Sequence, residues 1–171
     1  MNFLRSSLVA AAAALVVALP AHAGLTGDTV GTRYVGAGDT GVQNSVVGAG
    51  EEGNFFSNQF YDYGDSSFSI RSTSNFCGIF SCGGPSVSLQ LTSLDLGGPI
   101  TSVVVGTNLS GVTTAFTADS ITFTWSEQAI NAGTYLEARI NAVPEPETYA
   151  LMGLGLLGLA AVSRRGKKAH A

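Results

Sequence analysis

The chain has 171 residues and a formal net charge of −4 at pH 7, but five of its eight basic residues lie near its two ends. Residues 24–142 contain three arginines and ten carboxylates, which gives a net charge of −7. This part of the chain therefore repels nucleic acid and anionic lipid. This part of the chain has no lysine and no histidine, because the two histidines of the chain, His22 and His170, lie outside it. Histidine-based catalysis and a histidine-ligated zinc site are therefore excluded there. We expect no catalytic residue, no cofactor and no metal.

The N-terminal segment, residues 1–23, has the pattern of a secretory signal peptide. Arg5 supplies the positive start, an apolar run extends from Leu8 to Leu19, and small residues stand at Ala21 and Ala23. We expect a signal helix that engages the general secretion machinery and is cleaved after Ala23. An uncleaved anchor helix is the alternative, although the apolar run is shorter than the roughly 20 residues that span a bilayer.

Residues 24–142 form a passenger segment in which short β-prone runs alternate with turns rich in Gly, Pro, Asn and Asp. Several runs alternate polar and apolar residues, and Ile100 to Val105 is a continuous β-branched run, as in a strand covered on both faces. This spacing predicts an all-β domain, an antiparallel β-sandwich of jelly-roll-like type. The expected strands are residues 32–35, 45–47, 55–63, 67–72, 86–91, 100–105, 120–125 and 135–142.

The two cysteines, Cys77 and Cys82, are separated by four residues. An exported chain meets an oxidising compartment, so this even pair predicts a disulfide. Because the closed loop is small, the expected stabilisation is about 2 kcal/mol. Free thiols are the alternative; a redox pair would favour Cys-x-x-Cys spacing, and a metal would need further soft ligands nearby.

Acidic residues offer two candidate sites in the passenger, each with a structural alternative. Asp62 and Asp65 could bind calcium through their carboxylates, or they could simply be solvated turn residues at the end of a strand. A glycosidase would need a pair of carboxylates, but the sequence does not bring a particular pair together. The candidates are Glu51, Glu52, Asp62, Asp65, Asp95, Asp119, Glu127 and Glu137.

Aromatic residues offer a third candidate. Trp125, Tyr61 and Tyr63 could form a platform that stacks on sugars. Trp125 falls on the same strand face as Ile121 and Phe123, however, and this placement favours packing in the core.

The C-terminal segment, residues 143–168, has three parts in a fixed order. Residues 143–147, Val-Pro-Glu-Pro-Glu, form an extended linker because two prolines so close forbid a regular helix or central strand. Residues 148–162 are almost purely apolar and predict a short transmembrane helix, and the basic cluster at 164–168 places the tail inside the cell. As a helix, Tyr149 to Val162 reaches only about 21 Å against a hydrocarbon core of about 30 Å, which suits a transient hold on the inner membrane.

This order of parts resembles the PEP-CTERM sorting domain. The resemblance lies in Val143, Pro144, Glu145 and Pro146, the Gly/Leu-rich run that follows, and Arg164 and Arg165. It implies that an exosortase of the inner membrane recognises the tail and removes it near the Pro-Glu-Pro sequence. It also implies that the carrier protein reaches the surface or the extracellular polysaccharide matrix of a Gram-negative bacterium. The resemblance does not extend to residues 24–142.

These features predict an exported, non-enzymatic protein of the cell surface or extracellular matrix. The expected partners are exosortase, the secretion machinery and, transiently through residues 148–162, the inner membrane, with no nucleic acid. The alternative is a carbohydrate-binding module that binds the extracellular polysaccharide.

Overall fold

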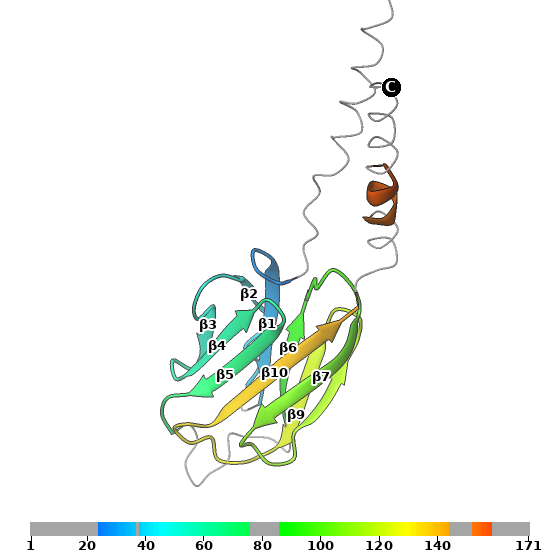
Figure 1. Cartoon of the computed structure of the whole chain (residues 1–171). Coiled ribbons are helices and arrows are strands. Elements are labelled where there is room, and N and C mark those ends of the chain that lie inside the picture. The colour runs from blue at the N-terminus through cyan, green and yellow to red at the C-terminus, as the bar shows by residue number, and fades with distance from the viewer. Residues whose placement is uncertain (1–23, 37, 76–85, 144–151, 159–171) are drawn as a thin grey trace, which may run out of the picture. The chain divides into compact units, whose positions relative to one another are not determined.

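The computed structural model describes residues 24–36, 38–75, 86–143 and 152–158 (Figure 1). Within these residues the chain forms ten β-strands, all paired in antiparallel fashion and all in one compact unit that ends at Val143. The strands are β1 (Thr29–Val35), β2 (Gln43–Val46), β3 (Gly53–Phe55), β4 (Gln59–Gly64), β5 (Ser67–Ser72), β6 (Ser86–Thr92), β7 (Ile100–Thr107), β8 (Thr113–Phe116), β9 (Ile121–Ser126) and β10 (Tyr135–Ala142).

The strands form two five-stranded sheets, in the orders β2-β1-β6-β9-β8 and β3-β4-β5-β10-β7. The sheets lie face to face, as Figure 1 shows, and one hydrophobic core takes side chains from both. The expected all-β antiparallel architecture is confirmed. The jelly-roll-like topology describes it less well, because four pairs of consecutive described strands (β1–β2, β3–β4, β4–β5 and β8–β9) are neighbours in the same sheet, whereas a jelly roll is built from Greek keys.

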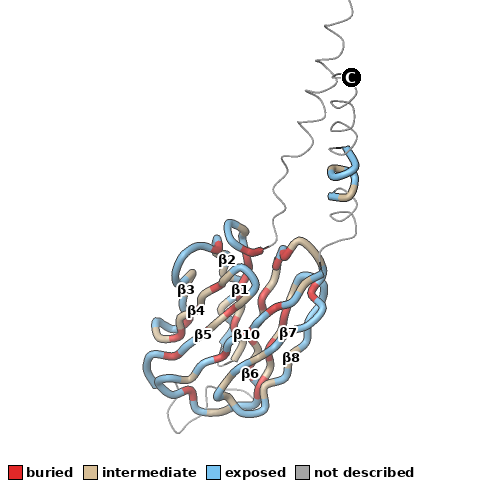
Figure 2. Tube along the Cα trace, viewed as in Figure 1, coloured by how far each residue is buried: buried red, intermediate tan, exposed pale blue. Residues whose placement is uncertain are grey.

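Alternating side chains place the core where the sequence predicts it. Figure 2 shows buried positions alternating with exposed ones along β10, and with intermediate or exposed ones along β5. On β10, Leu136, Ala138 and Ile140 are buried, and the residues between them are exposed. Successive side chains on a strand point to opposite faces, so each of these strands has one face in the core and one in solvent.

The expected single strand over residues 55–63 is wrong, because a tight turn divides it into β3 and β4. Phe56 and Ser57 adopt φ angles of 55° and 61°, in the left-handed region. The amide of Asn58 donates to the carbonyl of Phe55 over 3.2 Å, and the side chain of Asn54 accepts from the amide of Ser57, also over 3.2 Å. Two left-handed residues in succession match the twist of a hairpin, so the turn overrides the β propensity of the aromatic run.

The expectation that residues 100–105 are covered on both faces is also wrong. β7 is the last strand of its sheet, with β10 as its neighbour among the described strands, and the side chain of Val104 is 60% exposed. A continuous β-branched run reports a preference for extended backbone and does not by itself report burial. The strand β8 was not predicted at all, although it supplies the edge of the other sheet.

Tyrosine side chains join the two sheets through hydrogen bonds inside the core. The hydroxyl of Tyr63 on β4 lies 2.8 Å from the hydroxyl of Thr32 on β1, and both residues are buried. The hydroxyl of Tyr61 donates to the side-chain oxygen of Gln43 on β2 over 3.1 Å. Gly53 allows this arrangement, because a Cβ atom there would lie 2.3 Å from the Tyr61 hydroxyl oxygen. The sheets are therefore fixed by directed polar contacts as well as by apolar packing.

Tyr34 offers a contrast, since its buried hydroxyl has no hydrogen-bond partner among the described residues. Burial raises the pKa of Tyr34 to about 12, and the nearby Gln59 side chain opposes that shift without forming a hydrogen bond of normal geometry. Burial also raises the pKa of Tyr63 far above its usual range, although the hydrogen bond from Thr32 opposes the shift. Both phenols therefore stay neutral at physiological pH.

The two tyrosines give a matched pair of substitutions. Tyr63→Phe leaves the Thr32 hydroxyl buried without its partner, so we expect a loss of about 1–2 kcal/mol in the free energy of unfolding. Tyr34→Phe removes a hydroxyl that has no protein partner, so its effect is expected to lie within about 0.5 kcal/mol of zero or to be stabilising. Urea denaturation of the two variants measures the difference, and equal losses would contradict the hydrogen-bond assignment.

Candidate functional site

The sorting segment begins where the folded domain ends. β10 finishes at Ala142, and the next residue, Val143, is 52% exposed. Its amide still donates to the carbonyl of Pro99 over 3.3 Å, which is the last described backbone contact before the prolines. Pro144, Glu145 and Pro146 lie outside the described residues, as do Arg164 and Arg165. The chain thus leaves the sheet one residue before the Pro-Glu-Pro sequence.

The apolar part of the segment is described over residues 152–158, which are helical. Four large apolar side chains of this helix are exposed: Met152, Leu154, Leu156 and Leu157. The rest of the expected helix over 148–162 lies outside the described residues. In the part of the chain that the structure describes, no helix is both long enough and apolar enough to cross a membrane.

Two further predictions fall on residues outside the described ranges. The signal-cleavage residues Ala21 and Ala23 belong to residues 1–23, and the predicted disulfide of Cys77 and Cys82 belongs to residues 76–85. Both stay predictions from the sequence.

The aromatic side chains that could have formed a sugar platform are in the core. Trp125 is 4% exposed, and Tyr61 and Tyr63 are each exposed by 2% or less. Tyr61 and Tyr63 contact one another edge to face, with ring centroids 6.3 Å apart, while Trp125 meets Tyr34. Core packing is therefore confirmed for Trp125, and these three rings present no stacking surface to a sugar.

Asp62 and Asp65 do not converge on one site. Asp65 follows β4 and accepts a hydrogen bond from the hydroxyl of Thr26. Asp62, on β4 itself, interacts with Glu52, Glu51 and Arg71 instead. Among the described residues no group of three potential ligands is arranged to hold a metal ion. Asp65 is therefore better described as a solvated turn residue than as a calcium ligand.

Glu52 is a structural carboxylate. Gly53, the first residue of β3, lies opposite Tyr61 of β4. The amide of Tyr63, two residues further along β4, therefore has no partner in β3. One carboxylate oxygen of Glu52 accepts this amide over 2.7 Å, and the other accepts the amide of Gly48 over 2.9 Å. With both oxygens on backbone donors, Glu52 is poorly placed to act as a nucleophile or general acid of a glycosidase.

Most other acids have similar local partners. Glu51 forms an ion pair with Arg71, and Asp39 forms one with Arg33. The guanidinium of Arg33, with help from the Gly41 amide, lowers the pKa of Asp39 to about 2, so this exposed carboxylate is ionised above that pH. The turn acids accept from nearby groups: Asp95 from the amide of Gly97 over 3.1 Å, and Asp119 from the hydroxyl of Thr117 over 3.0 Å.

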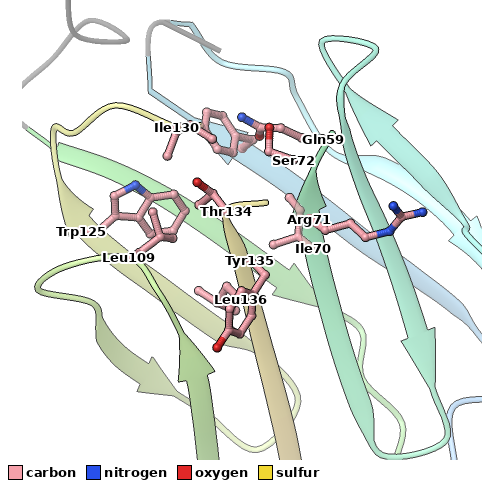
Figure 3. A pocket seen from close by; sticks show the side chains of 11 residues that line it. Gln59, Ile70, Arg71, Ser72, Leu109, Trp125, Ile130, Thr134, Tyr135 and Leu136 are labelled. Carbon is pink, nitrogen blue, oxygen red and sulfur yellow. The ribbon is translucent and has the colours of Figure 1, made fainter. Parts of the chain in front are cut away.

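A cavity opens between the sheets beside Trp125. Figure 3 shows Trp125 and Leu109 on one side of it and Ile70 and Ser72 on the other. Its volume is about 30 Å³, far below the 300–1,000 Å³ or so that small-molecule sites occupy. The indole N–H of Trp125 is buried with no hydrogen-bond partner among the described residues. The space does not accommodate a sugar ring.

The sequence did not indicate that Glu52 accepts hydrogen bonds from two backbone amides, or that β7 lies at the edge of its sheet. A glutamate two residues after the Gly48-Ala-Gly50 turn and directly before a strand was the available signal for a carboxylate that binds backbone amides. The edge position of β7 depends on which strands pair, and pairing between distant segments leaves no local pattern.

The fold and the tail together define an all-β domain that carries a separate C-terminal sorting segment. Residues 142–165 match the PEP-CTERM protein-sorting motif. The chain therefore carries a PEP-CTERM tag of the kind borne by exosortase substrates, and the resemblance expected for residues 143–168 is confirmed. No curated protein and no solved structure matched the chain.

Asp62 provides a test of the electrostatics of this face. Burial, followed by repulsion from Glu52 and Glu51, raises the pKa of Asp62, so its ionised form is disfavoured in the folded state. Asp62→Asn should therefore raise the melting temperature at pH 7. This gain should vanish as the pH falls below about 3.9, where the carboxyl is protonated in both states.

Thermal unfolding at pH 7 and pH 3 measures this dependence. Glu127→Gln makes the same charge change at an exposed position away from the cluster and serves as the control. A lower melting temperature for Asp62→Asn at pH 7 would show that the carboxylate is stabilising there.

Proposed function

We propose that this chain is a cargo protein of the PEP-CTERM pathway, in which a β-sandwich passenger is exported and exosortase then removes its tail. One observation carries the proposal: the sandwich ends at Ala142, and the sorting motif starts at that residue. Cleavage within the Pro-Glu-Pro sequence would cut no described strand and would leave in place the last described backbone hydrogen bond, that from Val143 to Pro99. The passenger would keep its core after processing and reach the cell surface or the extracellular matrix.

The membrane contact in this proposal is transient. The helical residues 152–158 expose Met152, Leu154, Leu156 and Leu157, which are apolar side chains that favour a lipid or protein environment over water. Residues 148–162 are short for a permanent span, and glycines at three positions weaken them as a helix. Such a segment is suited to holding the chain at the membrane, beside the processing enzyme, until the tail is cleaved.

The passenger itself is proposed to be non-enzymatic. The sequence between Gly24 and Ala142 has no histidine and no lysine, which leaves carboxylates and tyrosines as acid–base groups. Glu52, Glu51 and Asp39 are engaged by backbone amides or arginines, and Tyr61 and Tyr63 are buried. These engagements support a structural passenger over a catalytic one.

Polysaccharide binding is the alternative function of the passenger. Because Trp125, Tyr61 and Tyr63 are buried, these rings cannot be the binding surface. A sugar would have to contact exposed aromatic residues such as Phe116 and Tyr135. Saturable glycan binding that is lost in Tyr135→Ala and kept in Trp125→Phe would favour this alternative.

Cell fractionation of tail variants tests the sorting proposal. We expect the parent chain to leave the inner membrane as a shortened form, whereas a chain with both Pro144→Ala and Pro146→Ala should stay in the inner-membrane fraction with its tail attached. Glu127→Ala, an exposed change outside the motif, should behave like the parent. Deletion of residues 143–171 should release the passenger into the periplasm without surface delivery. Normal processing of the double proline variant would contradict the proposal.

A further inference from the structure

We propose that two copies of this chain associate through β7, which pairs with β7 of the second copy to form one continuous ten-stranded sheet. β7 (Ile100–Thr107) has eight residues and is the longest of the four edge strands that the described sheets expose. The other three edges are shorter: β2 and β8 have four residues each and β3 has three. Among the described strands of its sheet, β7 pairs with β10 on one side and with none on the other. Figure 1 shows β7 at the margin of the front sheet, and the strand drawn beyond it, β8, belongs to the other sheet.

The backbone groups of β7 that face away from β10 follow from the hydrogen bonds of β10. The amide of Ile140 donates to Ser66 over 2.8 Å, toward the β5 side, whereas the amide of Tyr135 donates to Asn108 over 3.0 Å, toward the β7 side. Because these directions alternate along a strand, Arg139 faces β7 and is paired with Val104. Val103 and Val105, the neighbours of Val104, therefore direct their amides and carbonyls to the open edge.

From Ser102 to Thr107 this edge has none of the features that usually prevent association. A β-bulge at Thr101 and the hydrogen bond from the Ile100 amide to the Ala118 carbonyl affect only the first residues of the strand. Natural edge strands are blocked by charges, prolines or very short length. The sequence from Leu96 to Ala118 contains no charged residue, and the strand itself contains no proline. Val104 is 60% exposed on the outer face of the sheet. A long, uncharged, β-branched edge is a template for a further strand.

The distribution of charge on the domain favours a second copy of this chain as the partner that binds the β7 edge. Residues 24–142 carry a net charge of −7, so two copies repel one another over most of their surface. Asp95 and Asp119, the acids nearest in sequence to the uncharged stretch, both lie outside β7 near its Ile100 end, because the Leu94 amide donates to Asp119 and the Ile100 amide donates to Ala118. The acid nearest to the strand itself is Glu137, which lies one strand further in, on β10. The β7 edge is therefore a place where two of these acidic domains can meet without opposing like charges across the contact.

The strand is also complementary to itself. In a two-fold antiparallel arrangement centred on Val104, Val103 of each copy lies opposite Val105 of the other, and both have outward backbone groups. Val104 then faces its own equivalent in a non-hydrogen-bonded pair, where the Cα atoms of the two strands are about 4.5 Å apart. Ser102 lies opposite Gly106, and the regular pairing ends there because Thr101 is a bulge residue. Every pair is thus uncharged and sterically small.

Cross-linking tests the contact and its register. The purified protein carrying Val104→Cys is oxidised mildly and run on a non-reducing gel, because the proposed spacing suits a symmetric disulfide. We expect most of this variant to run as a covalent dimer. Val46→Cys is the matched control, since Val46 is 64% exposed on the β2 edge of the other sheet, and it should cross-link no more than the parent chain. Equal cross-linking of the two variants would overturn the proposal.

Light scattering on the purified protein provides the second measurement. The parent and Val46→Lys should have twice the monomer mass, while Val104→Lys should fall to half of that value because two like charges would meet at the two-fold axis. Both lysine variants add the same charge at exposed valines and should keep the circular dichroism of the parent. A monomeric parent, or a dimer that survives Val104→Lys, would show that β7 does not form the contact.

Discussion

The contact between the aromatic faces of the two sheets is the interaction on which the rest of this structure depends. Tyr63 contacts Phe68 with ring centroids 4.9 Å apart, and Phe68 in turn stacks on Phe123 of the opposite sheet at 6.4 Å. The Tyr63 hydroxyl reaches Thr32 across the same interface. Buried aromatic rings supply large apolar area, and the hydroxyls fix how the sheets lie against one another. Without this layer neither sheet would have a covered face.

This use of the aromatic residues decides where function can reside. Rings that are committed to the core are unavailable for a ligand, and the carboxylates nearest to them, such as Glu52, hold backbone amides. Among the described residues, the accessible features include the uncharged edge at β7, the exposed rings of Phe116 and Tyr135, and the point at Ala142 where the tail begins. The passenger therefore acts, in our account, as a stable body that is carried and displayed, and the tail supplies the sorting information.

Sequence patterns predicted the local parts of this molecule and failed on the non-local ones. The alternation along β5 and β10 predicted both strands at their observed bounds, because a strand with one buried face carries that period by itself. The turn at Phe56 and Ser57 and the short strand β8 were missed, because neither has a glycine, proline or long period to mark it. β7 was assigned to the sheet interior, since β-branched composition indicates a strand but not its neighbours. The sorting motif was predictable because its information lies in contiguous residues.

The central claim is that the folded domain and the tail are separable parts, one kept and one removed. Intact-mass and peptide mass spectrometry of the mature protein, recovered from the surface or matrix of cells that export it, tests this directly. The account predicts an N-terminus at Gly24 and a C-terminus close to the Pro144–Pro146 sequence, with every strand from β1 to β10 retained. Recovery of an intact peptide from Met152 to Lys168 in the mature surface form would contradict it.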